Sequence, residues 1–403
     1  MRISKLSAIL LIALIIAASI FTIVVIRAYV LPKAIVVPND YPFIQTAIDH
    51  ANAGDTITVK KGTYQLTAPV EISKPLSLIG EEPQTTIIDG NGHNPSASAA
   101  NLMTFQIGAP DVTISGFTIT DCNFAIRVDN FAKQSIPSNC KIAGNIFTNN
   151  HQAIDIQRSE NFEIKDNTIS NNEGGIYVSS NGGASTGVIS GNTVTQNGQG
   201  ISIYSQSVVV SDNRITNNRE GLNLEWTGPY SIFDNRILNN SLCGVIFGPG
   251  VSNTLFHNNE VEGNTVGIKL ENFVVSGDAY LGSGNVVYSN NLVNNGQNAF
   301  VENFYLNKNP NSVNGTDIVS WDNGKDGNYW SDYKGNGTYI IDQNNIDNHP
   351  LVFPAFIDGL IIFYLIIVLV AVLATVITFL LLFRRHRKTQ LTDGKKTLRE
   401  HVA

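Results

Sequence analysis

A repeat that extends from Val112 to Val301 constrains the fold more than any other feature of the chain. Each unit has an aliphatic residue, two small or polar residues, Asn, one variable residue and a second aliphatic residue. A polar run with one or two Asn follows, then Gly, then two aliphatic residues one position apart. Intervals between equivalent Asn residues are 22, 25, 21, 22, 24 and 31, a range typical of repeat architectures. These residues are Asn145, Asn167, Asn192, Asn213, Asn235, Asn259 and Asn290.

Alternating aliphatic residues within each unit predict two short strands, because successive side chains of a strand point to opposite faces. Gly and Asn separate the strands, and both tolerate the positive φ of tight corners. A unit of about 22 residues is too short for a strand, a helix and a return. The repeat therefore predicts an all-β solenoid, a parallel β-helix with two or three strands per coil.

Stacked coils align equivalent positions along the interior, so the aliphatic residues should form ladders. One predicted ladder is Ile142, Ile164, Ile189, Val210, Ile232 and Phe256, and another is Ile154, Ile176, Ile201, Leu222, Val245 and Ile268. The recurring Asn has two interpretations, an inward amide ladder at a coil corner or a metal or ligand site. We favour the amide ladder, because amides without carboxylates make poor metal sites.

The chain before the repeat supplies a cap and the first coils. Apolar residues have helical spacing over Phe43–Ala53, and Gly54 is a natural stop for a helix. We expect this helix to cover the first coil, because an exposed strand edge invites association. Strands are expected at Thr56–Val59, Val70–Ile72, Leu76–Ile79 and Thr86–Ile88, and Gly90–Ala100 is expected to be a loop.

The opening sequences IQTAIDHANAGDTITVKKGTY and LSLIGEEPQTTIIDG resemble the start of the pectin-lyase-like right-handed β-helix superfamily. The repeats resemble its branch that includes the copper-associated periplasmic NosD proteins. Gly327–Tyr333 reads GNYWSDY, which is similar to the segment that closes NosD-like domains, and Asp347–Leu351 resembles their end. The resemblance covers Ile35 to Leu351 and implies a right-handed helix. The short run Lys334–Tyr339 stands where many relatives carry an Asp/Gly-rich run of a calcium-binding type, so no calcium site is expected there.

Both ends of the chain carry apolar runs. A basic start precedes the run Leu6–Ile26, which fits a secretory signal or an uncleaved signal-anchor. The uncharged run Leu360–Phe383 predicts a transmembrane helix, and the basic cluster Arg384–Lys388 after it should stay cytoplasmic. The expected location is the cell membrane, with the repeats extracellular or periplasmic. A net charge of -7 argues against a nucleic-acid partner.

The predicted organisation has six parts. They are a signal or anchor (1–33), a cap with the first coils (34–111), the repeats (112–301), a C-terminal cap (302–355), a transmembrane helix (356–383) and a basic tail (384–403). Three cysteines do not make a disulfide framework: Cys122 and Cys140 either pair or remain buried thiols, and Cys243 is left over. Candidate glycosylation sites are Asn239, Asn314 and Asn336.

Outward residues of the strand after each Gly form one long face. They are Arg127, Asp129, Asp155, Gln157, Tyr177, Ser179, Ser202, Tyr204, Asn223, Glu225, Trp226, Lys269 and Glu271. The family resemblance implies that a polysaccharide groove commonly lies on this strand. Aromatic rings suit stacking on sugars and carboxylates suit hydroxyl groups, so the expected ligand-binding residues are Tyr177, Tyr204, Glu225 and Trp226. The alternative is that these aromatics are ordinary outward residues under long loops.

Catalysis and metal binding have weaker support. Asp129 and Asp155 lie on adjacent coils, roughly 8 Å apart at the strand spacing, which suits an inverting hydrolase. Arg127 lies opposite Asp155, however, so a cross-coil ion pair explains the same residues. No two of the seven His stand at ligand spacing and no Cys or Met cluster joins them, so we expect no metal and no cofactor.

The leading hypothesis is a membrane-anchored extracellular module that recognises a glycan or cell-envelope polymer without catalysis. One alternative is a carbohydrate-active enzyme of the lyase or hydrolase type. A second alternative is an accessory protein of a membrane complex, as in the NosD-like branch, with membrane-complex subunits as partners.

Overall fold

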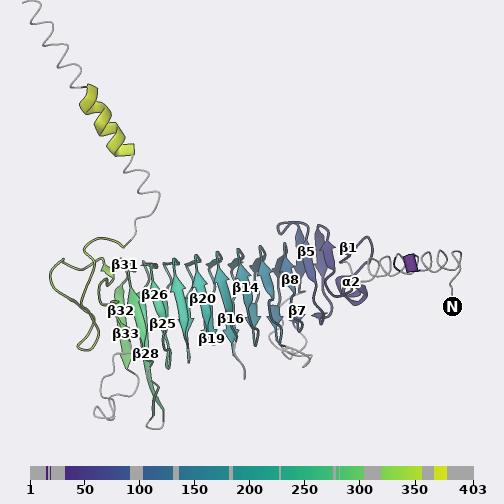
Figure 1. Ribbon diagram of the computed structural model, residues 1–403, viewed down its shortest axis with the longest axis horizontal. Coiled ribbons are helices and arrows are strands. Elements are labelled where there is room, and N and C mark those ends of the chain that lie inside the picture. Colours follow the sequence, from purple (N-terminus) through teal and green to yellow (C-terminus); the bar gives the residue numbers. More distant parts are fainter. Residues whose placement is uncertain are drawn as a thin grey trace, which may run out of the picture. The chain divides into compact units, whose positions relative to one another are not determined.

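The computed structural model describes residues 15, 16, 19, 32–90, 103–129, 136–180, 185–226, 228–275, 278–280, 282–303, 319–355 and 367–378 (Figure 1). The chain divides into two compact units, Met1–Ala355 and Phe356–Ala403. All the strands of the described residues lie in the first unit, and the second contains a helix at residues 367–378.

Three parallel sheets, here called A, B and C, form the first unit. Sheet A has twelve strands: β1 (Ala34–Val37), β2 (Thr56–Val59), β5 (Ser77–Gly80), β8 (Thr113–Ser115), β11 (Lys141–Ala143), β14 (Phe162–Lys165), β17 (Gly187–Ser190), β20 (Val208–Ser211), β23 (Tyr230–Phe233), β26 (Leu255–His257), β30 (Asn285–Tyr288) and β33 (Val319–Ser320).

Sheet B has eleven strands: β3 (Gly62–Gln65), β6 (Thr86–Asp89), β9 (Thr118–Thr120), β12 (Ile146–Thr148), β15 (Thr168–Ser170), β18 (Thr193–Thr195), β21 (Arg214–Thr216), β24 (Arg236–Leu238), β27 (Glu260–Glu262), β31 (Asn291–Val293) and β34 (Tyr329–Trp330).

Sheet C also has eleven strands: β4 (Val70–Ile72), β7 (Met103–Ile107), β10 (Phe124–Val128), β13 (Gln152–Ile156), β16 (Gly174–Ser179), β19 (Gln199–Tyr204), β22 (Glu220–Leu224), β25 (Cys243–Phe247), β28 (Val266–Val275), β29 (Asp278–Tyr280) and β32 (Gln297–Asn303). Within it, β29 runs antiparallel to β28 and β32 runs parallel to β28.

The chain visits the sheets in the order A, B, C and then returns to A one position further along. Successive strands β11, β12 and β13 belong to A, B and C, and β14 pairs with β11 again. Each coil therefore has three strands and hydrogen-bonds the coils before and after it (Figure 1). This arrangement confirms the predicted all-β parallel β-helix.

Both predicted aliphatic ladders are present in the core. In sheet A, Ile142 pairs in register with Ile164 and Ile164 with Ile189. In sheet C, Ile154 pairs with Ile176 and Ile176 with Ile201. These side chains are almost completely buried, because alternation turns every second residue of each strand inward.

The recurring Asn forms the predicted amide ladder at the corner between sheets A and B. Asn167 donates from its backbone N–H and from Nδ2 to Asn192 Oδ1, both at 3.0 Å. Its Nδ2 also donates to Ile142 O of the preceding coil at 2.9 Å. Asp166, just before it, has φ 54°, the left-handed conformation that starts the corner.

A second amide ladder lies at the corner between sheets B and C. It comprises Asn150, Asn172, Asn197, Asn218, Asn240, Asn264 and Asn295, each bonded to the next. This ladder accounts for the further Asn in each repeat, whose role the spacing alone does not predict.

The N-terminal end of the solenoid is covered by α2 (Ile44–His50), which lies beside β1 (Figure 1). The predicted helix over Phe43–Ala53 is thus present but shorter, because Ala51 already has an extended backbone. Its inner face buries Ile44, Ala47 and Ile48 against the first coils, as a cap should.

The GNYWSDY segment closes the other end of the core. Asn328 is the last amide of the first ladder, and its N–H donates to Asp347 Oδ2 at 2.7 Å. Trp330 Nε1 donates to the same carboxylate at 2.9 Å, and its ring is fully buried against Trp321. A Cβ at Gly327 would lie 1.9 Å from Asp347 Oδ1, so the motif requires glycine there. The short antiparallel pair β35 (Tyr339–Ile340) and β36 (Ile346–Asp347) positions this acid.

The two predicted membrane segments fall largely outside the described residues. In the N-terminal run, only residues 15, 16 and 19 are described, and all three are helical. In the C-terminal run, residues 367–378 are helical and exposed. Within the described residues, no helix combines the length and the apolar character needed to cross a bilayer. The terminal membrane segments therefore remain predictions.

Candidate functional site

The outer face of sheet C carries one continuous row of aligned side chains. Its members are Gln106, Arg127, Asp155, Tyr177, Ser202, Asn223, Ile246, Lys269 and Phe300. A second row lies two residues further along each strand, where Ser179 pairs with Tyr204 and Glu271 pairs with Glu302. Parallel register thus brings side chains from distant repeats together on this face.

Near the middle of the face lies a cluster of Tyr177, Ser202, Tyr204, Asn223 and Glu225, here called the Tyr–Glu cluster. The rings of Tyr177 and Tyr204 have centroids 5.3 Å apart and planes at 42°. Tyr204 Oη donates to Glu225 Oε1 at 2.8 Å, and Asn223 Nδ2 donates to the same oxygen at 3.1 Å. The Tyr204 and Asn223 hydrogen bonds hold the carboxylate beside the rings.

Two polar atoms of the cluster are buried without a hydrogen-bond partner among the described residues. They are Ser202 Oγ and Asn223 Oδ1, on side chains that are only 2% and 6% exposed. The two residues are register neighbours on adjacent strands. Because a buried unpaired polar group costs free energy, such a pair marks a place where an ordered water or a ligand supplies the missing bonds.

Both tyrosines remain protonated over the physiological range. Burial raises the pKa of Tyr177, and the nearby carboxylate of Asp155 raises it further. Burial also raises the pKa of Tyr204, helped by the hydrogen bond to Glu225 and by its charge. The cluster therefore presents neutral aromatic rings beside an anionic acceptor.

The structure brings together three of the four predicted ligand-binding residues. Tyr177, Tyr204 and Glu225 lie in the cluster, and Trp226 is the second residue after the strand ends at Leu224. Trp226 has φ 63° and is 47% exposed, so strand alternation no longer sets its direction. Its role as a ligand-binding residue stays a prediction.

The repeat predicts that Ser202 and Asn223 lie on the face, but it does not single them out as binding residues. Their common register with Tyr177 was the available signal. Their burial and lack of partners depend on the packing of neighbouring side chains, which the sequence does not display.

The catalytic candidates form an ion-pair network at one end of the face. Arg127 Nε lies 2.9 Å from Asp129 Oδ2 and 3.6 Å from Asp155 Oδ2. Gln157 Nε2 donates to both oxygens of Asp155, whose residue is only 1% exposed. Burial raises the pKa of Asp155, while Gln157 and Arg127 oppose that rise. This geometry favours the cross-coil ion pair, and a catalytic role for the two acids remains untested.

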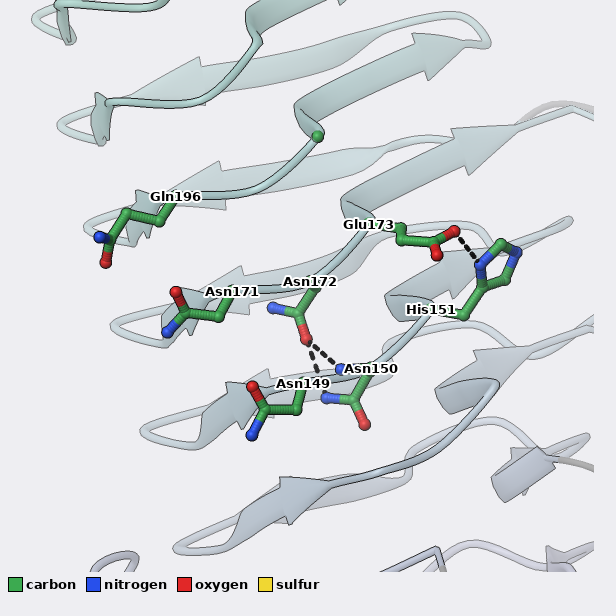
Figure 2. Close-up of a pocket in the computed structure, with 8 residues that line it drawn as sticks. Asn149, Asn150, His151, Asn171, Asn172, Glu173 and Gln196 are labelled. Atoms are coloured by element: carbon green, nitrogen blue, oxygen red, sulfur yellow. Dashed lines mark hydrogen bonds and ion pairs between the residues drawn. The ribbon is translucent and has the colours of Figure 1, made fainter. Parts of the chain in front are cut away.

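An open depression of about 450 Å³ lies elsewhere, along the corner between sheets B and C (Figure 2). Figure 2 shows ladder amides Asn150 and Asn172 bonded to each other, with Asn149 and Asn171 beside them. At its other edge His151 Nδ1 lies 2.5 Å from Glu173 Oε2. The ladder amides bond to one another, so this depression offers fewer unsatisfied groups than the Tyr–Glu cluster does.

Metal donors are dispersed over the described part of the chain, where no three His, Cys, Asp or Glu side chains lie close enough to hold an ion. His50 stacks on Tyr41 and His257 stacks between Phe233 and Tyr288. All three cysteines are buried free thiols, which decides between the two predicted states of Cys122 and Cys140.

Of the candidate glycosylation sites, Asn239 and Asn336 are exposed, and Asn314 lies outside the described residues. Their modification stays a prediction.

Comparison with known proteins identifies one family and several similar folds. The family model described as periplasmic copper-binding protein (NosD) matches residues 53–242 and 111–335. No curated protein matches the chain. The match confirms the predicted resemblance to the NosD proteins.

Solved structures are similar at low identity, a level that concerns the fold alone. The mannuronan C-5 epimerase AlgE6 A-module of Azotobacter vinelandii has 17% identity and a TM-score of 0.44, over 64% of this chain and 93% of its own. DFA-IIIase from Arthrobacter chlorophenolicus A6, in complex with DFA-III, has 14% identity and a TM-score of 0.48, over 81% and 99%. Pectate lyase Pel9A has 14% identity and a TM-score of 0.47, over 72% and 80%.

Proposed function

The chain belongs to the NosD family of β-helix proteins, and we propose that it binds a glycan or cell-envelope polymer along the outer face of sheet C without catalysis. The single observation that carries this proposal is the Tyr–Glu cluster. It combines two paired aromatic rings, a held carboxylate and two buried polar atoms that lack partners.

The chemistry of the cluster suits a sugar polymer. Aromatic faces pack against the C–H faces of sugar rings, and a carboxylate accepts hydrogen bonds from sugar hydroxyls. Ser202 Oγ and Asn223 Oδ1 can each accept a hydrogen bond that the protein leaves unmade. The cluster occurs at one place on the described face, so it would fix the position of a long ligand. The remainder of the face would add further contacts.

Copper, which the printed family description names, does not fit the described side chains. Copper sites use clusters of imidazole, thiolate or thioether ligands. Here the described His side chains are far apart in the fold and engaged with different partners, and the cysteines are buried singly.

We also propose that the β-helix is held outside a membrane by its terminal apolar runs. Support comes from the uncharged run Leu360–Phe383 followed by the basic cluster Arg384–Lys388. Exposed Asn239 and Asn336 are compatible with an exported domain. Cell fractionation with protease protection of the C-terminal tail tests this placement, and a tail cleaved in intact cells would contradict it.

A binding and product assay tests the function. The full chain in detergent would be incubated with a panel of polysaccharides, and bound and recovered glycan would be analysed by mass spectrometry. We expect binding with unchanged glycan mass, weakened at least tenfold in Tyr204→Ala. The matched control is Tyr288→Ala, which removes a half-buried outward tyrosine from sheet A.

Other outcomes favour other functions. Shortened or chemically altered glycan would make the protein an enzyme and direct attention to Asp129 and Asp155. Folded protein that neither binds nor alters any glycan would contradict recognition, and co-purification with membrane subunits would then favour an accessory role.

A further inference from the structure

We infer that the outer face of sheet C selects a hydroxyl-rich polymer without negative charge and rejects polymers of uronic acids. This inference rests on the proposed function and names the ligand class of the same site. Three features of the face carry it: its cations are already paired, its carboxyl groups are in excess, and its unpaired atoms accept hydrogen bonds.

The two cations of the face are each held by two carboxylates. At one end, Arg127 contacts Asp129 and Asp155. At the other end, Lys269 Nζ lies 2.8 Å from Glu271 Oε1 and also contacts Glu302. A polymer carboxylate would have to displace one of these partners to gain an ion pair, and the displaced carboxylate would then lose its own.

Carboxyl groups outnumber cations between β10 and β32 on the two described rows. The cations are Arg127 and Lys269, and the carboxyl groups are Asp129, Asp155, Glu225, Glu271 and Glu302. Burial raises the pKa of Asp155, which favours its uncharged form. If Asp155 is left out of the count, four carboxyl groups still face two cations. With two cations against at least four carboxyl groups, the face has a net negative charge, which disfavours a polyanion.

Of the two unpaired atoms of the cluster, Asn223 Oδ1 requires a donor from the ligand. Asn223 Oδ1 and Glu225 accept hydrogen bonds and cannot donate them. Ser202 Oγ can act either way. An ionised uronate carboxylate only accepts, whereas a sugar hydroxyl donates. The hydrogen-bonding groups of the cluster and the charge of the face thus both favour an uncharged polymer rich in hydroxyl groups.

Matched pairs of polymers that differ in charge but share a backbone test this selectivity. The pairs are polygalacturonate and its methyl ester, alginate and its propylene glycol ester, and carboxymethylcellulose and hydroxyethylcellulose. Affinity of the full chain in detergent would be measured at low and high salt. We expect the uncharged member to bind at least tenfold more tightly at low salt, with a smaller difference at high salt because salt screens the repulsion.

A variant separates the charge effect from other differences between the polymers. Glu271→Gln with Glu302→Gln frees Lys269 from both partners, so affinity for the charged member should rise several-fold. The control is Glu163→Gln on sheet A, which releases Lys141 from a 2.8 Å ion pair away from the face and should leave the selectivity as it was.

The outcomes for the two proposals are distinct. Equal or tighter binding of the charged members would overturn the selectivity while leaving polymer binding intact. Failure of every polymer to bind protein shown to be folded by circular dichroism would overturn the proposed function, and the selectivity with it.

Discussion

Tyr204 Oη donates a 2.8 Å hydrogen bond to the carboxylate of Glu225, which lies one coil further along sheet C. This bond joins two repeats through their outward side chains. It fixes one ring of the Tyr177–Tyr204 pair and one acceptor of the proposed site at the same time. Loss of the hydroxyl and loss of the ring should therefore have different effects.

Tyr204→Phe keeps the ring and removes the hydroxyl. We expect a loss of about 1 kcal/mol in unfolding free energy, because the bond reaches a charged acceptor in a half-buried position. Polymer affinity should fall less than in Tyr204→Ala, since the stacking surface remains. Urea unfolding and isothermal titration of both variants measure the two effects. Equal affinity of wild type and Tyr204→Ala would remove the cluster from the binding site.

Asn192→Ala interrupts the first amide ladder. Asn192 Oδ1 accepts hydrogen bonds from the backbone N–H and the Nδ2 of Asn167, and the N–H would be left buried and unpaired. We expect a loss of about 3 kcal/mol in unfolding free energy. Asn52→Ala, in the exposed turn after α2, is the matched control and should change stability by under about 0.5 kcal/mol. Equal stability of the two variants would contradict a stabilising ladder.

Asp347→Ala removes the acceptor that closes the C-terminal end. Asn328 N–H and Trp330 Nε1–H would both lose their partner in a fully buried site. We expect a loss of about 3 kcal/mol or more in unfolding free energy, with increased quenching of tryptophan fluorescence by acrylamide. Asp326→Ala serves as the comparison, since this half-buried acid lies just before the motif. Unchanged quenching would show that the Trp330 ring stays shielded from solvent when Asp347 is absent.

Asp155→Asn tests the pH dependence of stability. Burial raises the pKa of Asp155 in the folded protein above its ordinary value of 3.8. The folded state then binds the proton more tightly, so this contribution to stability is complete below the ordinary pKa. This contribution to stability is lost as pH rises through the raised pKa of Asp155 in the folded state. The variant lacks this titration and should gain stability relative to wild type between pH 3 and pH 7, as measured by urea unfolding at both values. A constant difference across that range would contradict the shift.

Thiol labelling tests the state of the cysteines. Burial raises the pKa of Cys122 and of Cys140 to about 12, and that of Cys243 to about 11. At pH 8 the reactive thiolate is therefore a smaller fraction than for an ordinary cysteine, and the sulfur atoms are also enclosed. We expect no labelling of folded protein within an hour and three labels per chain after denaturation. A Gln206→Cys variant, at an exposed position, should add one label that reacts at once.

The repeat alone predicted the parallel β-helix and its ladders. Equivalent residues at a period near that of one coil must stack, so the ladders through Ile164 and Ile176 and the amide ladder through Asn167 followed from spacing and alternation. The same reasoning placed Tyr177, Ser202 and Asn223 on the outer face. Local patterns were sufficient because each coil repeats the backbone of the one before it.

The tertiary structure decided which outward groups meet and which lack partners. Arg127 could be expected to lie near Asp155, but its division between two acids, and the burial of Asp155, depend on side-chain conformations. The bond from Trp330 to Asp347 joins residues outside the repeat, so no period predicts it. Ser202 Oγ is buried and unpaired, which the repeat pattern does not predict. The period of the repeat determines the path of the backbone. Burial and hydrogen bonding on the outer face depend instead on how different side chains from neighbouring repeats pack against one another.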